Sequence, residues 1–155
     1  MGTSQMMGEL WGAKAVDWTE LGEPVSRPAF EAAFTRTGIG PGTRLLDLGC
    51  GAGGAMVLAR SLGAEVTGLD ASSELVRVAR SRLPGVRVEV GDLEELPFQD
   101  AGFDVVTGFN SFQFAGDIPR ALREAQRVCR PGGAVLMCVW GPREKIGRAS
   151  CRERV

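Results

Sequence analysis

A glycine-rich loop between an apolar run and a helical segment is the feature that most constrains this chain. Residues 49–54 contain four glycines; they follow the apolar stretch 43–48 and open the segment 53–63, whose apolar residues recur at helical spacing. Glycine permits positive φ and close approach of the backbone to a ligand, and the free N–H groups at a helix N-terminus attract anionic groups. We therefore expect a binding loop at the end of a buried strand, and a ligand that carries a carboxylate or a phosphate.

Short apolar runs alternate with helical segments along the rest of the chain. We expect strands over 43–48, 64–70, 86–92, 103–109 and 132–140, and helices over 27–39, 53–63, 72–83 and 117–129. Alternation at this spacing is typical of the α/β class, in which right-handed crossovers give a doubly wound parallel sheet covered by helices on both faces. Ligands of such sheets bind at the carboxyl ends of the strands, so we expect one site there.

Composition narrows the kind of ligand. The chain has 155 residues, 44% of them hydrophobic, which suits one domain, and its net charge of −1 comes from interleaved charges that give no footprint for nucleic acid. No apolar run is long enough to cross a membrane, and four cysteines without CxxC spacing, with no histidine, argue against a metal site and fit the reducing cytoplasm. We expect a cytoplasmic protein that binds a small molecule, without a membrane or nucleic-acid partner.

The two ends of the chain differ in character from its middle. Residues 1–42 form a helical or irregular lead-in that could close over a ligand as a lid, with Trp11 or Trp18 lining the pocket or simply anchoring the segment. Residues 43–142 form the binding domain. Residues 146–155 resemble the translation of a common sequencing adapter rather than a basic tail, so we expect a non-native or disordered tail over 143–155 and a natural protein that continues beyond Glu144.

Two glycine patterns fit the loop, and they point to different functions. Gly49, Gly51 and Gly54 fit GxGxxG, which is typical of nicotinamide-dependent oxidoreductases. Gly49, Gly51 and Gly53, preceded by Asp47, fit DxGxGxG. The carboxylate favours the second pattern, because dinucleotide dehydrogenases usually have an apolar residue at that position.

With this DxGxGxG motif, the chain resembles a class I S-adenosylmethionine-dependent methyltransferase of the small bacterial type, methyltransferase type 11-like. The resemblance extends from Arg27 to Pro142, with the motifs in order. It implies a Rossmann-like sheet of parallel strands 3-2-1-4-5, S-adenosylmethionine as cofactor and an unidentified, small-molecule methyl acceptor. The sixth and seventh strands of the family are missing, which would leave the fifth strand as a bare edge and the chain poorly soluble.

The resemblance also implies which residues contact the cofactor. Asp47 holds the loop or approaches the cofactor's amino group. Asp70, which could equally cap a helix or serve NAD, can accept hydrogen bonds from both ribose hydroxyls. Asp92, otherwise a turn aspartate, approaches the adenine amine, and Leu93 donates a backbone N–H. The expected cofactor-binding set is Asp47, Gly49, Cys50, Gly51, Gly53, Asp70, Ala71, Asp92, Leu93, Phe109 and Asn110.

Some roles stay open at the level of the sequence. Phe109 and Asn110 would reach the cofactor's methionine portion or the acceptor pocket, whereas Cys50 is expected to pack as a small apolar residue and not to act as a nucleophile. No catalytic residue is assigned. The alternatives are an NAD(P)-dependent oxidoreductase and a non-catalytic cofactor-binding module.

Overall fold

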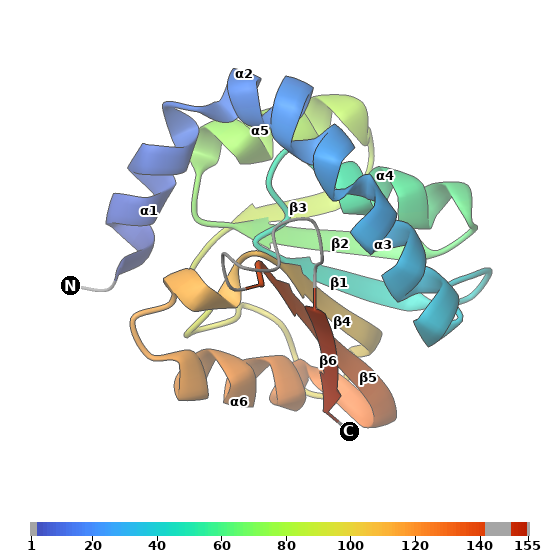
Figure 1. Cartoon of the computed structure of the whole chain (residues 1–155). Coiled ribbons are helices and arrows are strands. Elements are labelled where there is room, and N and C mark those ends of the chain that lie inside the picture. The colour runs from blue at the N-terminus through green and yellow to red at the C-terminus, as the bar shows by residue number, and fades with distance from the viewer. Residues whose placement is uncertain (1–2, 142–149, 155) are drawn as a thin grey trace.

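The computed structural model describes residues 3–141 and the backbone of residues 150–154, and its centre is a six-stranded sheet. The strands are β1 (Arg44–Leu48), β2 (Glu65–Asp70), β3 (Arg87–Val90), β4 (Phe103–Phe109), β5 (Cys129–Val139) and β6 (Ser150–Arg154). Their spatial order is β3-β2-β1-β4-β5-β6, and β1 to β5 are parallel (Figure 1). The expected α/β fold with strand order 3-2-1-4-5 is therefore confirmed.

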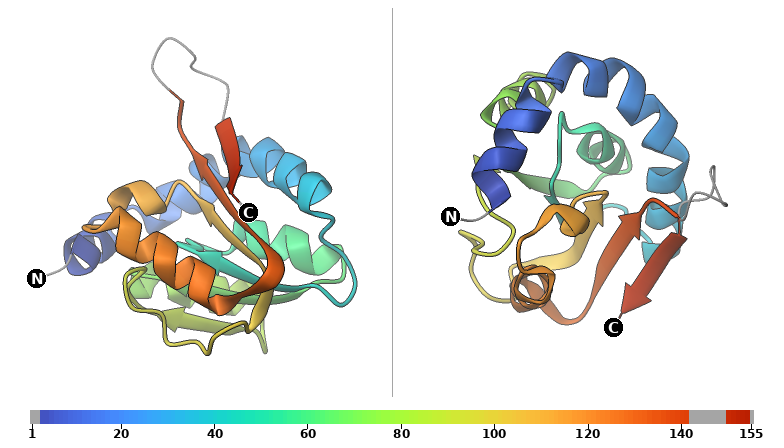
Figure 2. Two further views of the ribbon diagram at one scale, coloured as in Figure 1. Left: turned by 90° about the horizontal axis from the view of Figure 1, so that it is seen from below. Right: turned by 60° about the vertical axis from the view of Figure 1, so that its left-hand side comes forward.

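Helices cover both faces of the sheet. They are α1 (Thr3–Gly12), α2 (Ala15–Asp17), the π-helical turn η1 (Trp18–Gly22), α3 (Glu23–Thr37), α4 (Gly54–Ser61), α5 (Ser73–Arg82), the 3-10 turn η2 (Phe112–Phe114) and α6 (Ile118–Val128). The helices α3, α4 and α5 pack on one face, and α6 packs on the other (Figures 1 and 2). The two apolar cores lie between these layers and the sheet, which leaves the strand ends free to carry a site.

Local capping signals set several helix ends as the sequence predicts. The hydroxyl of Ser72 accepts a hydrogen bond from the N–H of Leu75 at 3.3 Å, and Asp117 caps α6 in the same way through Arg120 at 2.9 Å. The end of α5 lies two residues before Pro84. These boundaries are confirmed because each depends on contacts within one turn of chain.

Helix α3 and the start of β5 differ from the predicted boundaries. The helix expected from Arg27 begins at Glu23, and it continues through Pro28. β5 begins at Cys129 rather than at the expected residue 132, and it has a bulge near its start, since the register to β4 steps from Phe103↔Cys129 to Val105↔Ala134. Contacts between residues distant in sequence accompany both differences. At the start of α3, Glu23 pairs with Arg82 of α5. At the start of β5, Arg130 pairs with Asp104 of β4 at 2.7 Å.

The C-terminal segment differs from two predictions. The sequence predicts a disordered tail over 143–155, and it predicts that β5 is a bare edge of the sheet. Residues 150–154 form β6, which pairs antiparallel with β5 from Val135↔Arg154 to Val139↔Ser150. The unpaired N–H and C=O groups along an edge strand are a template for any segment that can extend beside them, whatever its side chains. Residues 142–149 and 155 lie outside the described residues.

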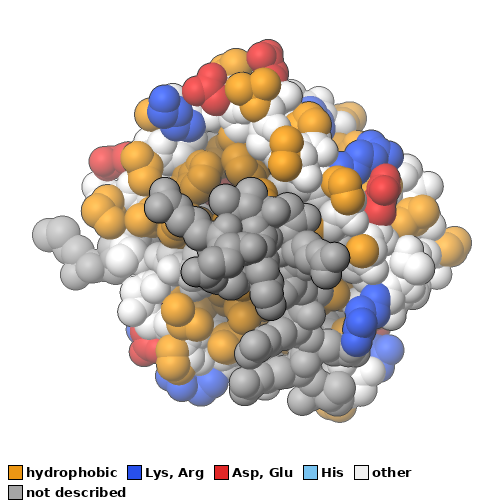
Figure 3. All heavy atoms as spheres, in the orientation of Figure 1, with side chains coloured by type: hydrophobic (Ala, Val, Ile, Leu, Met, Phe, Trp, Pro, Cys, Tyr) orange, Lys and Arg blue, Asp and Glu red, His pale blue; other side chains and the backbone are white. Residues whose placement is uncertain are grey.

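The N-terminal helices lie across the carboxyl ends of the strands. The hydroxyl of Thr3 donates a hydrogen bond to the carbonyl of Phe114 at 2.9 Å, and Gly8 lies against the carbonyl of Ala71 so closely that a Cβ there would clash with it. Apolar side chains gather on this face of the molecule (Figure 3). Those exposed on the N-terminal helices are Met6, Leu10, Val16, Leu21 and Val25. Within the described residues, no helix combines the length and the hydropathy that a membrane span requires.

Candidate functional site

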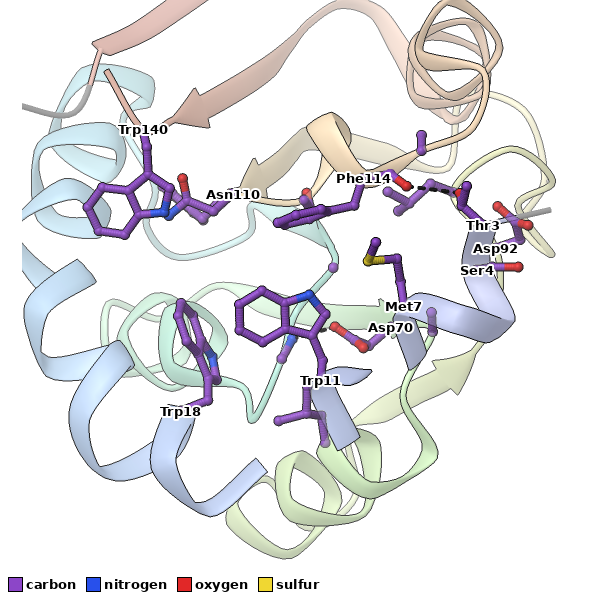
Figure 4. A pocket seen from close by; sticks show the side chains of 18 residues that line it. Thr3, Ser4, Met7, Trp11, Trp18, Asp70, Asp92, Asn110, Phe114 and Trp140 are labelled. Atoms are coloured by element: carbon purple, nitrogen blue, oxygen red, sulfur yellow. Dashed lines mark hydrogen bonds between the residues drawn. The ribbon is translucent and has the colours of Figure 1, made fainter. Parts of the chain in front are cut away.

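A pocket opens between the strand ends and the N-terminal helices. It encloses about 820 Å³ of empty space, a volume that includes open solvent at its mouth. Figure 4 shows Trp11 and Trp18 on one side and Asn110, Phe114 and Trp140 on another. The pocket is lined by Thr3, Ser4, Met7, Trp11, Trp18, Gly49, Gly51, Asp70, Ala71, Leu75, Asp92, Leu93, Phe109, Asn110, Ser111, Phe114, Ala115 and Trp140.

The glycine loop is fixed to the end of β2 by its own backbone. The N–H groups of Gly49 and Cys50 donate to the carbonyl of Leu69 at 2.7 and 3.0 Å, and the N–H of Gly51 donates to a carboxylate oxygen of Asp70 at 2.8 Å. Gly51 has φ 56°, and a Cβ there would lie 2.9 Å from Nε1 of Trp18. Glycine at this position therefore allows Trp18 to pack on the loop as well as permitting its turn.

Asp70 is buried at the carboxyl end of β2. One of its oxygens binds the N–H of Gly51 and the other binds the N–H of Ser72, each at 2.8 Å. Burial raises the pKa of this carboxyl, although these backbone hydrogen bonds oppose the shift. Each oxygen keeps a further lone pair, so the side chain can hold the loop and still accept hydrogen bonds from hydroxyls of a ligand.

Asp92 and Leu93 follow β3 at the same edge, and both line the pocket. One carboxylate oxygen of Asp92 accepts a hydrogen bond from the N–H of Glu94 at 2.9 Å, which makes it a turn aspartate. Its position on the pocket wall leaves the second oxygen available to a ligand. The two interpretations given to Asp92 from the sequence are thus compatible.

The end of β4 carries buried polar atoms without partners. Oδ1 of Asn110 and Oγ of Ser111 make no hydrogen bond with the described residues, and Asn110 adopts an unusual φ of 54°. An unpartnered buried polar atom costs free energy, and a strained residue persists only where the surroundings impose it. Since both side chains line the pocket, next to Phe109, they are suited to polar groups of a ligand.

Asp47 and Cys50 lie beneath the loop, outside the large pocket. With Gly49, Phe109 and Asn110 they line a smaller adjoining cavity. Asp47 accepts a hydrogen bond from the Thr107 hydroxyl at 2.7 Å. Burial, reinforced by the nearby carboxylates of Asp70 and Glu23 and opposed by that hydrogen bond, raises its pKa to about 7.

Two further loop residues, Cys50 and Gly53, have features that suit a structural role. Burial raises the pKa of the Cys50 thiol well above its ordinary value, so the group stays protonated and suits packing better than nucleophilic attack. Gly53 lines neither cavity; it precedes α4 with φ 87°. No group of three or more His, Cys, Asp or Glu side chains gathers as a metal site within the part of the chain that the structure describes.

Part of the wall that the sequence did not predict comes from the N-terminal helices. Thr3, Ser4 and Met7 line the pocket from α1, and no local pattern could assign them, since their placement depends on packing against distant loops. Trp140 had a usable signal, because it directly follows β5 at the same sheet edge as the predicted residues. Trp11 also faces the pocket, with its ring centroid 5.7 Å from that of Phe114.

Comparison with known proteins identifies the domain. A family model described as a methyltransferase domain matches residues 46–137. The malonyl-[acyl-carrier protein] O-methyltransferase of Serratia marcescens is 41% identical over 96 residues, which cover 62% of this chain and 38% of that protein. The chain spans 30 to 50% of the length of curated relatives that it matches.

Solved structures agree with this match. The methyltransferase chain of a complex with the Haloferax volcanii Trm112 methyltransferase activator has a TM-score of 0.73 and 30% identity, covering 83% of this chain and 59% of that one. A geranyl diphosphate C-methyltransferase of Streptomyces coelicolor, solved with Mg²⁺, geranyl diphosphate and S-adenosylhomocysteine, has a TM-score of 0.68 and 26% identity, covering 77% and 48%. By its sequence, its strand order and these matches, the chain belongs to the class I S-adenosylmethionine-dependent methyltransferase family.

Proposed function

We propose that the protein binds S-adenosylmethionine in the large pocket and transfers its methyl group to a small-molecule acceptor. The observation that carries this proposal is the meeting of residues from four strand ends on one cavity wall: Gly49 and Gly51 after β1, Asp70 on β2, Asp92 after β3 and Asn110 after β4. Such an arrangement offers separate contacts to the separate parts of one extended ligand.

The residues present fit the cofactor. The Asp70 carboxylate would accept hydrogen bonds from the ribose hydroxyls, and Asp92 with the backbone of Leu93 would recognise the adenine edge. The unpartnered oxygens of Asn110 and Ser111 would face the methionine end. Apolar wall residues, Trp11 among them, would exclude water from the cofactor.

The chemistry proposed for the pocket asks little of the side chains beyond placement. S-adenosylmethionine supplies an activated methyl group that an acceptor takes by in-line displacement, with the electron pair of the broken bond remaining on sulfur. The protein's contribution is to hold the acceptor in line and to keep water out. Among the described pocket-lining residues the titratable side chains are Asp70 and Asp92, both proposed for the cofactor, so no general base is assigned.

Calorimetric titration with S-adenosylhomocysteine and, separately, NADH tests the proposal. We expect saturable binding of the first ligand and none of the second. The variant Asp92→Ala should weaken S-adenosylhomocysteine binding roughly tenfold, the cost of about one hydrogen bond. Glu65→Ala, an exposed acid at the other end of β2, is the control and should bind as the unmodified protein does.

The same titrations separate the alternatives. Binding of NADH without S-adenosylhomocysteine would support an oxidoreductase and contradict the proposal. Binding of S-adenosylhomocysteine that does not respond to Asp92→Ala would reject the adenine contact but not the cofactor. Once binding is established, transfer of an isotopically labelled methyl group to candidate acceptors distinguishes a methyltransferase from a non-catalytic binding module.

A further inference from the structure

One buried carboxylate joins three separate elements behind the glycine loop. Glu23, the first residue of α3, is 6% exposed. Its Oε1 accepts a hydrogen bond from the N–H of Gly54 at 2.9 Å, and its Oε2 pairs with a guanidinium nitrogen of Arg82 at 2.6 Å. That same nitrogen, at the end of α5, donates to the carbonyl of Ala52 at 2.8 Å. We call Glu23 and Arg82, with their contacts to the loop, the clamp.

The clamp fills a position that the loop sequence leaves empty. The first N–H groups of a helix lack partners within the helix, and a side chain at the N-cap usually accepts one of them. Gly53 is the N-cap of α4 and has no side chain. Glu23 supplies the missing acceptor from 31 residues away, and its negative charge is favoured at the positive end of the helix dipole.

This contact also explains the last glycine of the loop. A Cβ on Gly54 would lie 2.7 Å from the carboxyl carbon of Glu23, so the position must be glycine for the carboxylate to approach. The sequence predicts an anionic ligand group at this helix N-terminus, and the protein's own carboxylate occupies that position. Gly54 completes the GxGxxG pattern, so a contact inside the protein accounts for the residue that made the chain resemble a dinucleotide-binding protein.

The clamp holds the N-terminal helices as well as the loop. η1 immediately precedes Glu23, and it places the Trp18 ring against Gly51. Farther along the same segment, Thr3 is hydrogen-bonded to the carbonyl of Phe114. The N-terminal helices, which form the roof of the pocket, are thus fixed to the glycine loop by Glu23 and to η2 by Thr3.

We propose that Glu23 is a positioning residue that couples the N-terminal helices to the glycine loop, so that affinity for the cofactor depends on the clamp. The inference rests on the proposed function only for the identity of the ligand. Without the clamp, residues 49–54 lose their anchor to α3, and a ligand must order both the loop and the roof when it binds. Since coupling is reciprocal, a bound ligand in turn strengthens the contact between roof and loop.

The test compares three variants of the full chain. Glu23→Ala removes the clamp, and Glu23→Gln keeps an oxygen for the N–H of Gly54 but removes the charge that pairs with Arg82. Glu31→Gln is the matched control, because Glu31 lies on the same helix and pairs with Arg27 at the surface at 2.8 Å. Hydrogen exchange of the ligand-free protein over residues 49–56 reports on the loop, and titration with S-adenosylhomocysteine reports on the pocket.

We expect Glu23→Ala to raise exchange in the loop selectively and to weaken S-adenosylhomocysteine binding by about tenfold or more, with Glu23→Gln intermediate and Glu31→Gln unchanged. Unchanged loop exchange and affinity in Glu23→Ala would overturn the proposal. If Glu23→Ala unfolds as a whole, the milder Glu23→Gln decides by the same two measurements. If the unmodified protein does not bind S-adenosylhomocysteine, the proposed function fails, yet loop exchange in the ligand-free variants still decides whether the clamp positions the loop.

A double substitution gives an independent check. In the unmodified protein Gly54→Ala forces a Cβ onto the Glu23 carboxylate and should increase loop exchange by itself. In the Glu23→Ala background the space is free, so Gly54→Ala should add little further exchange. Additive effects of the two substitutions would contradict the direct contact on which the proposal depends.

Discussion

Asp47 shows at the scale of one residue how the fold sets a side chain's protonation. Its carboxyl is 2% exposed, and its described hydrogen bond comes from the Thr107 hydroxyl. Burial raises its pKa from the ordinary value of 3.8 to about 7. The folded protein therefore binds a proton at Asp47 between about pH 4 and pH 7 that the unfolded chain releases, so this residue makes the fold less stable as the pH rises through that range.

The variant Asp47→Asn tests whether the buried carboxyl of Asp47 destabilises the fold as the pH rises. The amide has nearly the same shape, can still accept from Thr107 and carries no charge at any pH. We expect the variant to match the unmodified protein near pH 4 and to become more stable than it by on the order of 2–4 kcal/mol at pH 8. Chemical denaturation at both pH values measures the difference. A stability difference that does not change with pH would show that Asp47 titrates normally.

At the scale of elements, Arg127 on α6 supports the loop between β3 and β4. Its guanidinium donates to the carbonyls of Leu96 at 3.0 Å and Phe98 at 2.8 Å, and it pairs with Glu124 and Asp100, each at 2.7 Å. These hydrogen bonds and ion pairs raise the pKa of Arg127 and keep it charged. The loop that it supports contains, near its start, the pocket residues Asp92 and Leu93.

We therefore expect Arg127→Met to act at a distance on the pocket. The substitution keeps much of the apolar stem but removes the donors, which should lower the free energy of unfolding by roughly 1–3 kcal/mol and weaken S-adenosylhomocysteine binding. Thermal unfolding and calorimetry measure the two effects. Arg120→Met is the control, because Arg120 is exposed and pairs with Glu95 at 3.7 Å. Equal effects of the two substitutions would argue against a specific support by Arg127.

The same scale shows what the sequence could predict. The five parallel strands and the caps at Ser72 and Asp117 were predictable because each depends on periodicity or on neighbours within one turn. The strand-end positions of the pocket followed from topology. The role of Gly54 was not predictable, because its partner Glu23 is 31 residues away and no local pattern connects them. The α1 contribution to the pocket escaped prediction for the same reason.

At the scale of the whole molecule, β6 covers the edge of the sheet that β5 would otherwise expose. Its pairing with β5 satisfies backbone groups along five register positions, from Val135 to Val139. An exposed apolar strand edge promotes pairing between molecules. We therefore expect the C-terminal segment to limit self-association, although its sequence carries no pattern that predicts a strand.

Removal of residues 143–155 should consequently increase self-association. We expect the shortened chain to form larger species at lower concentration than the full chain, as measured by size-exclusion chromatography with light scattering. A shortened chain with Val139→Lys, which places a charge on the exposed β5 at a position outside the apolar cores, should associate less than the shortened chain alone. If the shortened and full chains behave alike, pairing with β6 does not protect this edge.

The pocket walls have one more consequence. Trp11, Trp18 and Trp140 are all the tryptophans of the chain, all three line the same pocket, and the sequence contains no tyrosine. The tryptophan fluorescence of the protein therefore comes entirely from the wall of one cavity, and no tyrosine emission overlaps it. A small molecule that enters the pocket should therefore change the tryptophan fluorescence. Collections of small molecules can be screened for binding to the pocket by this change, without an attached label.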